Sequence, residues 1–132
     1  MNQSVDALVD DLVGLEADLA TERGDFSFFG LVLREGASRW HLVVSAPWLD
    51  DEGMRSGLDE IAKRLRGGVD PEQFRLISAI IVLEEGDPVR IAFRNLAEVE
   101  HDRIRYEEVE TPSISIEKMY VITNRCSLNP AA

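Results

Sequence analysis

The stretch that decides the fold is residues 26–46, FSFFGLVLREGASRWHLVVSA. Two segments of it, Phe26 to Arg34 and Arg39 to Ala46, are rich in aromatic and β-branched residues, and the residues between them include Gly36. This pattern is typical of a β-hairpin. The second segment is apolar on both of its alternating faces, which suits a strand covered from two sides. We therefore expect this strand inside a sheet, not at its edge.

Helical and extended patterns alternate around the hairpin. Apolar residues three and four positions apart and Asp-Pro pairs indicate helices, whereas continuous or alternating apolar runs indicate strands. The expected elements are a helix over 4–22, a helix over 50–66, one helical turn after 70, a buried strand over 76–83, a short helix after 87, irregular or short strand structure over 99–109, and a last strand over 115–123.

These elements predict an α+β or mixed α/β fold. We expect a single mixed β-sheet of about four to five strands, flanked by about two to three helices. The sequence contains no internal repeat, linker or low-complexity tract. Residues 1–124 are therefore expected to form a single globular domain, followed by a flexible tail over 125–132.

Charge and composition argue against a nucleic-acid-binding, a membrane-spanning and a secreted protein. The 132 residues include 25 Asp and Glu against 14 Lys and Arg, a net charge of −11, which repels phosphate backbones and argues against nucleic acid as a partner. No apolar run approaches the roughly 20 residues of a membrane helix, and residues 1–11 carry acids where a secretory signal carries basic residues. We therefore expect a cytoplasmic protein. Cys126 is the single cysteine, so no intramolecular disulfide is expected.

The most distinctive stretch is residues 40–50, WHLVVSAPWLD. Together with the segment YVITNR at 120–125, it resembles small bacterial proteins of unknown function, a likeness that implies no activity and no site residue. Strand ends that lead into helices are favoured ligand positions, so Ser45, Trp48 and Asp50 are candidate pocket residues. The alternative is that the Pro-Trp pair closes the core over the sheet end while Asp50 caps the next helix.

A row of carboxylates is the candidate metal site. Glu98, Glu100 and Asp102 alternate along the chain, and an extended conformation would place all three on one face. Hard cations such as Mg2+ bind carboxylates, and His101 could join them from a bend. The alternative is the solvated face of an edge strand, where charges discourage pairing with other chains. We favour this alternative and expect no metal or other cofactor.

The sequence contains no recognisable motif that would combine a nucleophile with a catalytic base. His41 and His101 are the two histidines, no serine lies in a G-x-S-x-G turn, and Cys126 lies in the expected tail. His41 has apolar neighbours, which is typical of a hydrogen-bonded interior histidine. The order of elements is similar to that of nuclease-like α/β domains, in which acids and a lysine hold a metal. Glu117 and Lys118 are adjacent, however, and would point to opposite faces of a strand.

The first helix gives the leading functional hypothesis. All six charged residues from Asp6 to Glu22 are acidic, and a basic partner would relieve their mutual repulsion. Gly14 lowers helix stability by roughly 1 kcal/mol relative to alanine, which suggests a close neighbour. The apolar stripe either packs on the sheet of the same chain or forms a heptad-like seam with a second copy; its members are Val5, Leu8, Leu12, Leu15 and Leu19.

The sequence therefore favours a protein-interaction or accessory domain without catalysis. Self-association is one form of this hypothesis. A metal-dependent nuclease-like enzyme and a small-molecule sensor with a pocket near Trp48 are the alternatives. They would be distinguished by a metal cluster and by a ligand cavity, respectively.

Overall fold

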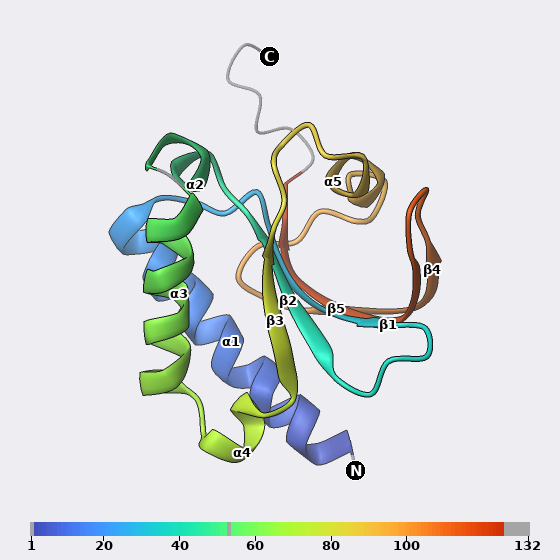
Figure 1. The fold of residues 1–132 in the computed structure, drawn as a ribbon, viewed down its shortest axis with the longest axis horizontal. Coiled ribbons are helices and arrows are strands. Elements are labelled where there is room, and N and C mark those ends of the chain that lie inside the picture. The colour runs from blue at the N-terminus through green and yellow to red at the C-terminus, as the bar shows by residue number, and fades with distance from the viewer. Residues whose placement is uncertain (1, 53, 126–132) are drawn as a thin grey trace.

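A computed structural model describes residues 2–52 and 54–125, and the side chains of residues 5–49 and 55–125. The chain forms one mixed five-stranded sheet with helices on both faces (Figure 1). In chain order the elements are α1 (Asn2–Arg23), β1 (Phe28–Arg34), β2 (Trp40–Ser45), α2 (Pro47–Glu52), α3 (Met54–Gly68), α4 (Pro71–Phe74), β3 (Ile77–Val82), α5 (Pro88–Phe93), β4 (Ile104–Glu110) and β5 (Ser115–Asn124). The predicted α+β class is confirmed.

The sheet has the strand order β3-β2-β1-β5-β4. β1 and β2 form the predicted antiparallel hairpin, with Phe29 opposite Val44 and Leu31 opposite Leu42. β5 pairs antiparallel with β1 and with β4, whereas β3 runs parallel to β2. A parallel pair needs a long crossover connection, which α3 supplies here. β2 is an interior strand, as its two apolar faces predict.

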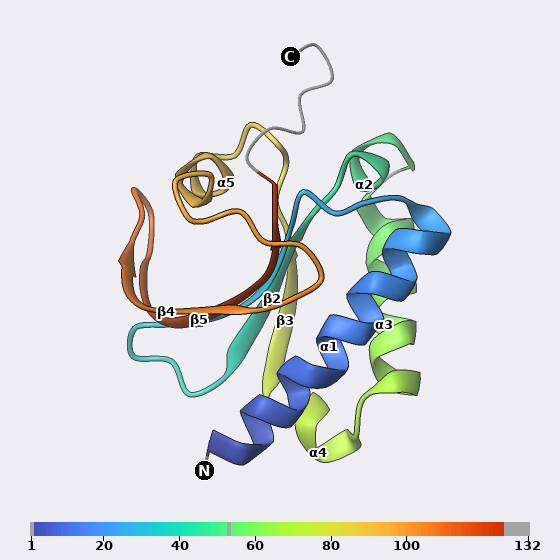
Figure 2. The same ribbon diagram turned by 180° about the vertical axis from the view of Figure 1, so that it is seen from behind.

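One face of the sheet is covered by α1 and α3, which lie side by side (Figure 2). Leu8, Leu12 and Leu19 of α1 are fully buried, and they share a core with Ile61 and Leu65 of α3. The stripe predicted for the first helix therefore packs on its own sheet. A seam with a second copy would require these same buried side chains, so the packing on the sheet is the correct alternative.

The opposite face of the sheet carries α5 and a second core. Phe28 of β1 stacks on Phe93 of α5 with ring centroids 4.8 Å apart, and both are buried with Val32 and Val43. The short helix after residue 87 forms because Asp87 accepts a hydrogen bond from the Val89 amide at 2.8 Å. Asp70 caps α4 in the same way, so both Asp-Pro predictions are confirmed.

Two elements differ from the sequence prediction. The segment expected as a buried strand, β3, is the edge strand of the sheet, and most of its side chains are half-buried. Its continuous apolar character follows from being covered on both faces, by α3 and by the core under α5, while its outer edge is open. The helix expected over 50–66 is two helices: α2 begins at Pro47, before the predicted start, and α3 extends to Gly68.

Other expectations concern the C-terminal end and membranes. Arg125, the first residue of the expected tail, is held by the sheet: its Nε donates to the Phe26 carbonyl at 2.9 Å. Residues 126–132, including Cys126, lie outside the described residues.

Among the helices that the structure describes, none combines the length and the apolar character needed to cross a membrane.

Candidate functional site

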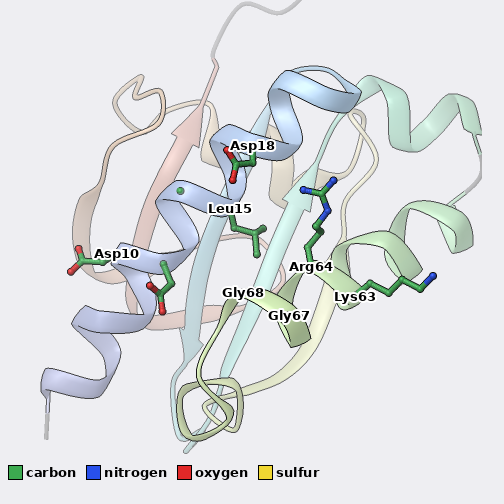
Figure 3. A pocket seen from close by; sticks show the side chains of 9 residues that line it. Asp10, Leu15, Asp18, Lys63, Arg64, Gly67 and Gly68 are labelled. Atoms are coloured by element: carbon green, nitrogen blue, oxygen red, sulfur yellow. The ribbon is translucent and has the colours of Figure 1, made fainter.

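A pocket of about 480 Å³ lies between α1 and α3 (Figure 3). The α1 side of the pocket combines acidic, small and apolar residues, and the α3 side combines basic residues with the two glycines that end the helix. Its lining consists of Asp10, Asp11, Gly14, Leu15, Asp18, Lys63, Arg64, Gly67 and Gly68. The acidic surface of the first helix therefore forms one wall of a groove.

The pocket is open because three of its lining residues, Gly14, Gly67 and Gly68, are glycines without side chains. A Cβ atom built on Gly14 or on Gly67 would have no neighbour within 4 Å, and one built on Gly68 would lie 3.9 Å from Leu15 Cδ1. Gly14 is therefore not required for close packing, and the expectation of a close neighbour at this position was wrong. The absent side chains leave space above Leu15, which forms the apolar floor.

The α1 wall is negatively charged. Asp11, Gly14 and Asp18 are spaced by three and four residues, so they lie along one face of the helix. Asp10 forms an ion pair with Arg103. Asp11 has no ion pair with any residue that the structure describes. The C-terminal end of α3, at Gly67 and Gly68, adds the negative end of a helix dipole to the same pocket.

The α3 wall carries two cations, but one is already neutralised. Arg64 donates a hydrogen bond to Glu22 of α1 and lies 3.9 Å from Glu60. This hydrogen bond lowers the pKa of Glu22 and raises that of Arg64, since it favours the charged form of both groups. Lys63 points away from α1 (Figure 3). The negative charge of α1 in the pocket is therefore incompletely balanced by α3.

The structure places two of the three predicted pocket residues, Ser45 and Trp48, on opposite faces of the sheet. The Ser45 hydroxyl lies on the α5 side of the sheet, where it donates to the Leu83 carbonyl at 2.7 Å. Trp48 lies in the core under α1, where its Nε1 donates to the Gly24 carbonyl at 2.9 Å and its ring packs edge-on against Phe26. Asp50 belongs to α2, but its side chain lies outside the described residues. Trp48 closes the core, as the alternative interpretation holds.

Ser45 belongs to a buried polar network that sequence reasoning missed. Ser27 and Ser45 both lie within hydrogen-bond distance of Glu85 Oε2, at 2.6 and 2.8 Å. Arg90 is fully buried and donates to the Asn124 side chain at 3.2 Å and to the Ser27 carbonyl at 3.0 Å. These contacts connect Arg90 of α5, and Glu85 just before it, to Ser27, Ser45 and Asn124 at the end of the sheet. The only sequence signal was an arginine in the short helix after residue 87.

The carboxylate row is not a strand face. Residues 100–102 form bends, so Glu98, Glu100 and Asp102 do not share the regular face that was expected. Glu100 binds Arg125, with an oxygen-to-nitrogen distance of 3.0 Å. Among the side chains that the structure describes, no three His, Cys, Asp or Glu residues are grouped so that they could hold a metal ion.

His101 instead binds a buried carboxylate. Its Nδ1 lies 2.6 Å from Glu16 Oε1, and the Thr123 hydroxyl donates to Glu16 Oε2 at 2.9 Å. Glu16 is fully buried, so it is not available to a basic partner, unlike the expectation for all six acidic residues of the first helix. The burial is tolerated because both carboxylate oxygens have partners. His101 adopts a left-handed backbone conformation, with φ of 51°.

The remaining catalytic candidates are dispersed. His41 is half-buried on β2 and, contrary to expectation, has no side-chain hydrogen bond to any described residue. Lys118 lies on β5 opposite Glu107 of β4. Comparisons of the chain with protein-family models, with curated proteins and with solved structures found no match. The groove between α1 and α3 is therefore the best candidate for a functional surface.

Proposed function

We propose that this chain is a protein-interaction domain whose groove between α1 and α3 binds a short basic segment of a partner protein. The observation that carries the proposal is a pocket of about 480 Å³ with an acidic wall, an apolar floor and no side chain at Gly14 or Gly67. A segment with an apolar residue over Leu15 and a lysine or arginine beside Asp11 and Asp18 fits these features.

Charge complementarity favours a basic occupant. Three aspartates line the pocket from α1, of which Asp10 is already paired with Arg103. Among the described residues, the cations on the opposite wall are Lys63 and Arg64. Arg64 is bound to Glu22, and Lys63 points away. A cation from a partner would relieve the repulsion along α1, where each close pair of like charges costs a few tenths of a kcal/mol. The overall charge of −11 would also accelerate encounter with a basic partner.

The glycines favour a close approach of the partner backbone. Without side chains at Gly14 and Gly67, a bound segment can reach Leu15 and the carbonyl end of α3. The pocket has room for a few side chains and not for a complete helix face. A short segment is therefore the occupant that matches it, with the modest affinity expected of a small interface.

Titration with a designed peptide tests this proposal. We would add a short peptide of alternating lysine and leucine to the 15N-labelled chain, and a second peptide with glutamate in place of lysine. The proposal predicts amide shift changes at residues 10–18 and 63–68 with the basic peptide alone. Changes confined to other surfaces, or equal changes with both peptides, would contradict it.

Matched variants separate local recognition from general charge attraction. Replacing Asp11 and Asp18 by serine removes two charges from the groove. Replacing Glu35 and Glu84 by serine removes the same charge from exposed positions elsewhere. We expect the first pair to weaken peptide binding about tenfold and the second pair to have little effect, since distant surface charges are screened by salt. Equal losses in both pairs would refute a specific groove.

Self-association through β3 is a second candidate. This edge strand has no charged residue in Ile77–Val82, and within the described chain it pairs only with β2. Uncharged apolar edges favour pairing with a further strand. Sedimentation over a range of concentrations should then reveal a dimer, and Ser78→Lys at an exposed β3 position should yield a monomer. A monomeric parent chain would exclude this candidate.

A further inference from the structure

A second cavity lies on the other face of the sheet, beneath α5. It has a volume of about 190 Å³ and is bounded by β1, β2 and β3, by α5 and by the loop that precedes β5. Val43 and Phe93 form its buried walls, while Val89 of α5 is half-buried at its side. The cavity is therefore an apolar space that continues the core of this face to the surface.

Two cationic or hydrogen-bonding side chains line this apolar cavity. Arg34 follows Val32 by two residues on β1, so both lie on the α5 side of the sheet. His41 of β2 is directly opposite Val32 in the strand register and lines the same space. Neither side chain forms an ion pair or hydrogen bond with the residues that the structure describes. Their nitrogen atoms thus keep donors that a bound molecule can use.

The combination defines a ligand class. We propose that this cavity binds a compact apolar carboxylate, with the ring or short alkyl chain between the sheet and α5 and the carboxylate at Arg34 and His41. A guanidinium group binds a carboxylate through two parallel hydrogen bonds, and an imidazole offers a further donor. The apolar walls supply binding energy by excluding water from the hydrocarbon part.

The volume limits the size of this ligand. A cavity of about 150 Å³ accommodates a benzene molecule, so 190 Å³ has room for one ring or a chain of similar volume. Long fatty acids exceed it. A ligand of this size has few atoms, so its dissociation constant is expected between about 0.1 and 1 mM. This site lies across the sheet from the α1–α3 groove and is independent of the function proposed for that groove.

The test uses benzoate and hexanoate as probes, with benzamide and hexanamide as their neutral counterparts. Titrations of the full 15N-labelled chain are expected to shift the amides of residues 32–34, 41–43 and 89–93 with the carboxylates. The neutral amides should bind at least about tenfold more weakly, because they lack the charge that the guanidinium recognises. Val89→Phe should block binding by filling the cavity.

Two exposed arginines provide the matched control. Arg34→Gln should weaken benzoate binding about tenfold. Arg55 is an exposed residue of α3, so Arg55→Gln removes the same charge and should leave benzoate binding unchanged. Because Arg34 is exposed, the Arg34→Gln protein should fold even if the Val89→Phe protein does not. The proposal is overturned if neither carboxylate binds at about 10 mM, if the amides bind equally well, or if both arginine variants behave alike.

Discussion

Alanine at Gly14 should make the domain more stable, although glycine lines the proposed binding groove. Gly14 lies within α1, and, apart from the adjacent backbone of the helix itself, a Cβ atom at this position would meet no atom within 4 Å. The substitution therefore gains helix propensity and restricts the unfolded chain without a steric penalty. We expect the free energy of unfolding to rise by about 0.5–1 kcal/mol.

Gly57 provides the opposite case in the neighbouring helix. A Cβ atom there would overlap with Leu49 Cδ2, and Leu49 is only 1% exposed. The leucine has to shift within a packed core, which costs about 1–3 kcal/mol and outweighs the gain in helix propensity. Gly57→Ala should therefore lower the free energy of unfolding by about 1–2 kcal/mol.

Thermal and urea unfolding, followed by circular dichroism, measure both variants. For a chain of this length a change of 1 kcal/mol corresponds to roughly 3–5 °C in the unfolding midpoint. The midpoint should rise for Gly14→Ala and fall for Gly57→Ala. A clear loss of stability in Gly14→Ala would show that an atom packs against this position, and the groove described between α1 and α3 would then be wrong.

Three further predictions concern the core, the buried carboxylate and the ion pair beside the groove. Leu12→Asp should lower the free energy of unfolding by about 2–5 kcal/mol or more, because Leu12 is fully buried; a melting curve like that of the parent would contradict the core assignment. His101→Ala should cost about 1–3 kcal/mol in urea unfolding, since it removes a partner from the buried carboxylate of Glu16, and an unchanged midpoint would show that water replaces the ring. Arg64→Gln should raise the lowered pKa of Glu22 toward 4.5, which NMR titration can follow. Because the pKa of Glu22 is lower in the folded than in the unfolded chain, this pair stabilises the fold above pH 4.5, and its contribution fades as the pH falls through the folded-state pKa.

Local signals in the sequence were sufficient for most of the elements. The Asp-Pro pairs at 70 and 87 predicted two short helices because a capping carboxylate and a proline act within a few residues. The hairpin was evident because its strands adjoin in the chain and both faces of the second strand are apolar. The interior position of β2 followed from the same pattern.

Long-range pairing explains what the sequence did not reveal. Glu16 occupies a helical position that looks exposed, and its burial depends on His101, which lies 85 residues further along the chain. Arg90 is buried because the carbonyl of Ser27 and the side chain of Asn124 converge on it. β3 has the composition of a central strand, but its edge position depends on the crossover through α3.

The candidate site was predicted in part. The acidic surface of the first helix and the unusual Gly14 were both visible in the sequence, but the glycine was assigned to close packing. The groove arises only because Gly67 and Gly68 of α3 lie opposite it, and that juxtaposition is a consequence of tertiary packing. The pocket beneath α5 likewise joins residues from three strands and a helix.

The most direct test of the groove compares two substitutions at Gly14. Alanine and glutamine have similar helix propensities relative to glycine, but only glutamine extends a side chain into the space above Leu15. The measurement is the affinity of the lysine–leucine peptide for each variant by isothermal titration calorimetry. The proposed function predicts near-parental binding for Gly14→Ala and a loss of about tenfold or more for Gly14→Gln. Equal binding by both variants would contradict the assignment of the groove as the interaction site.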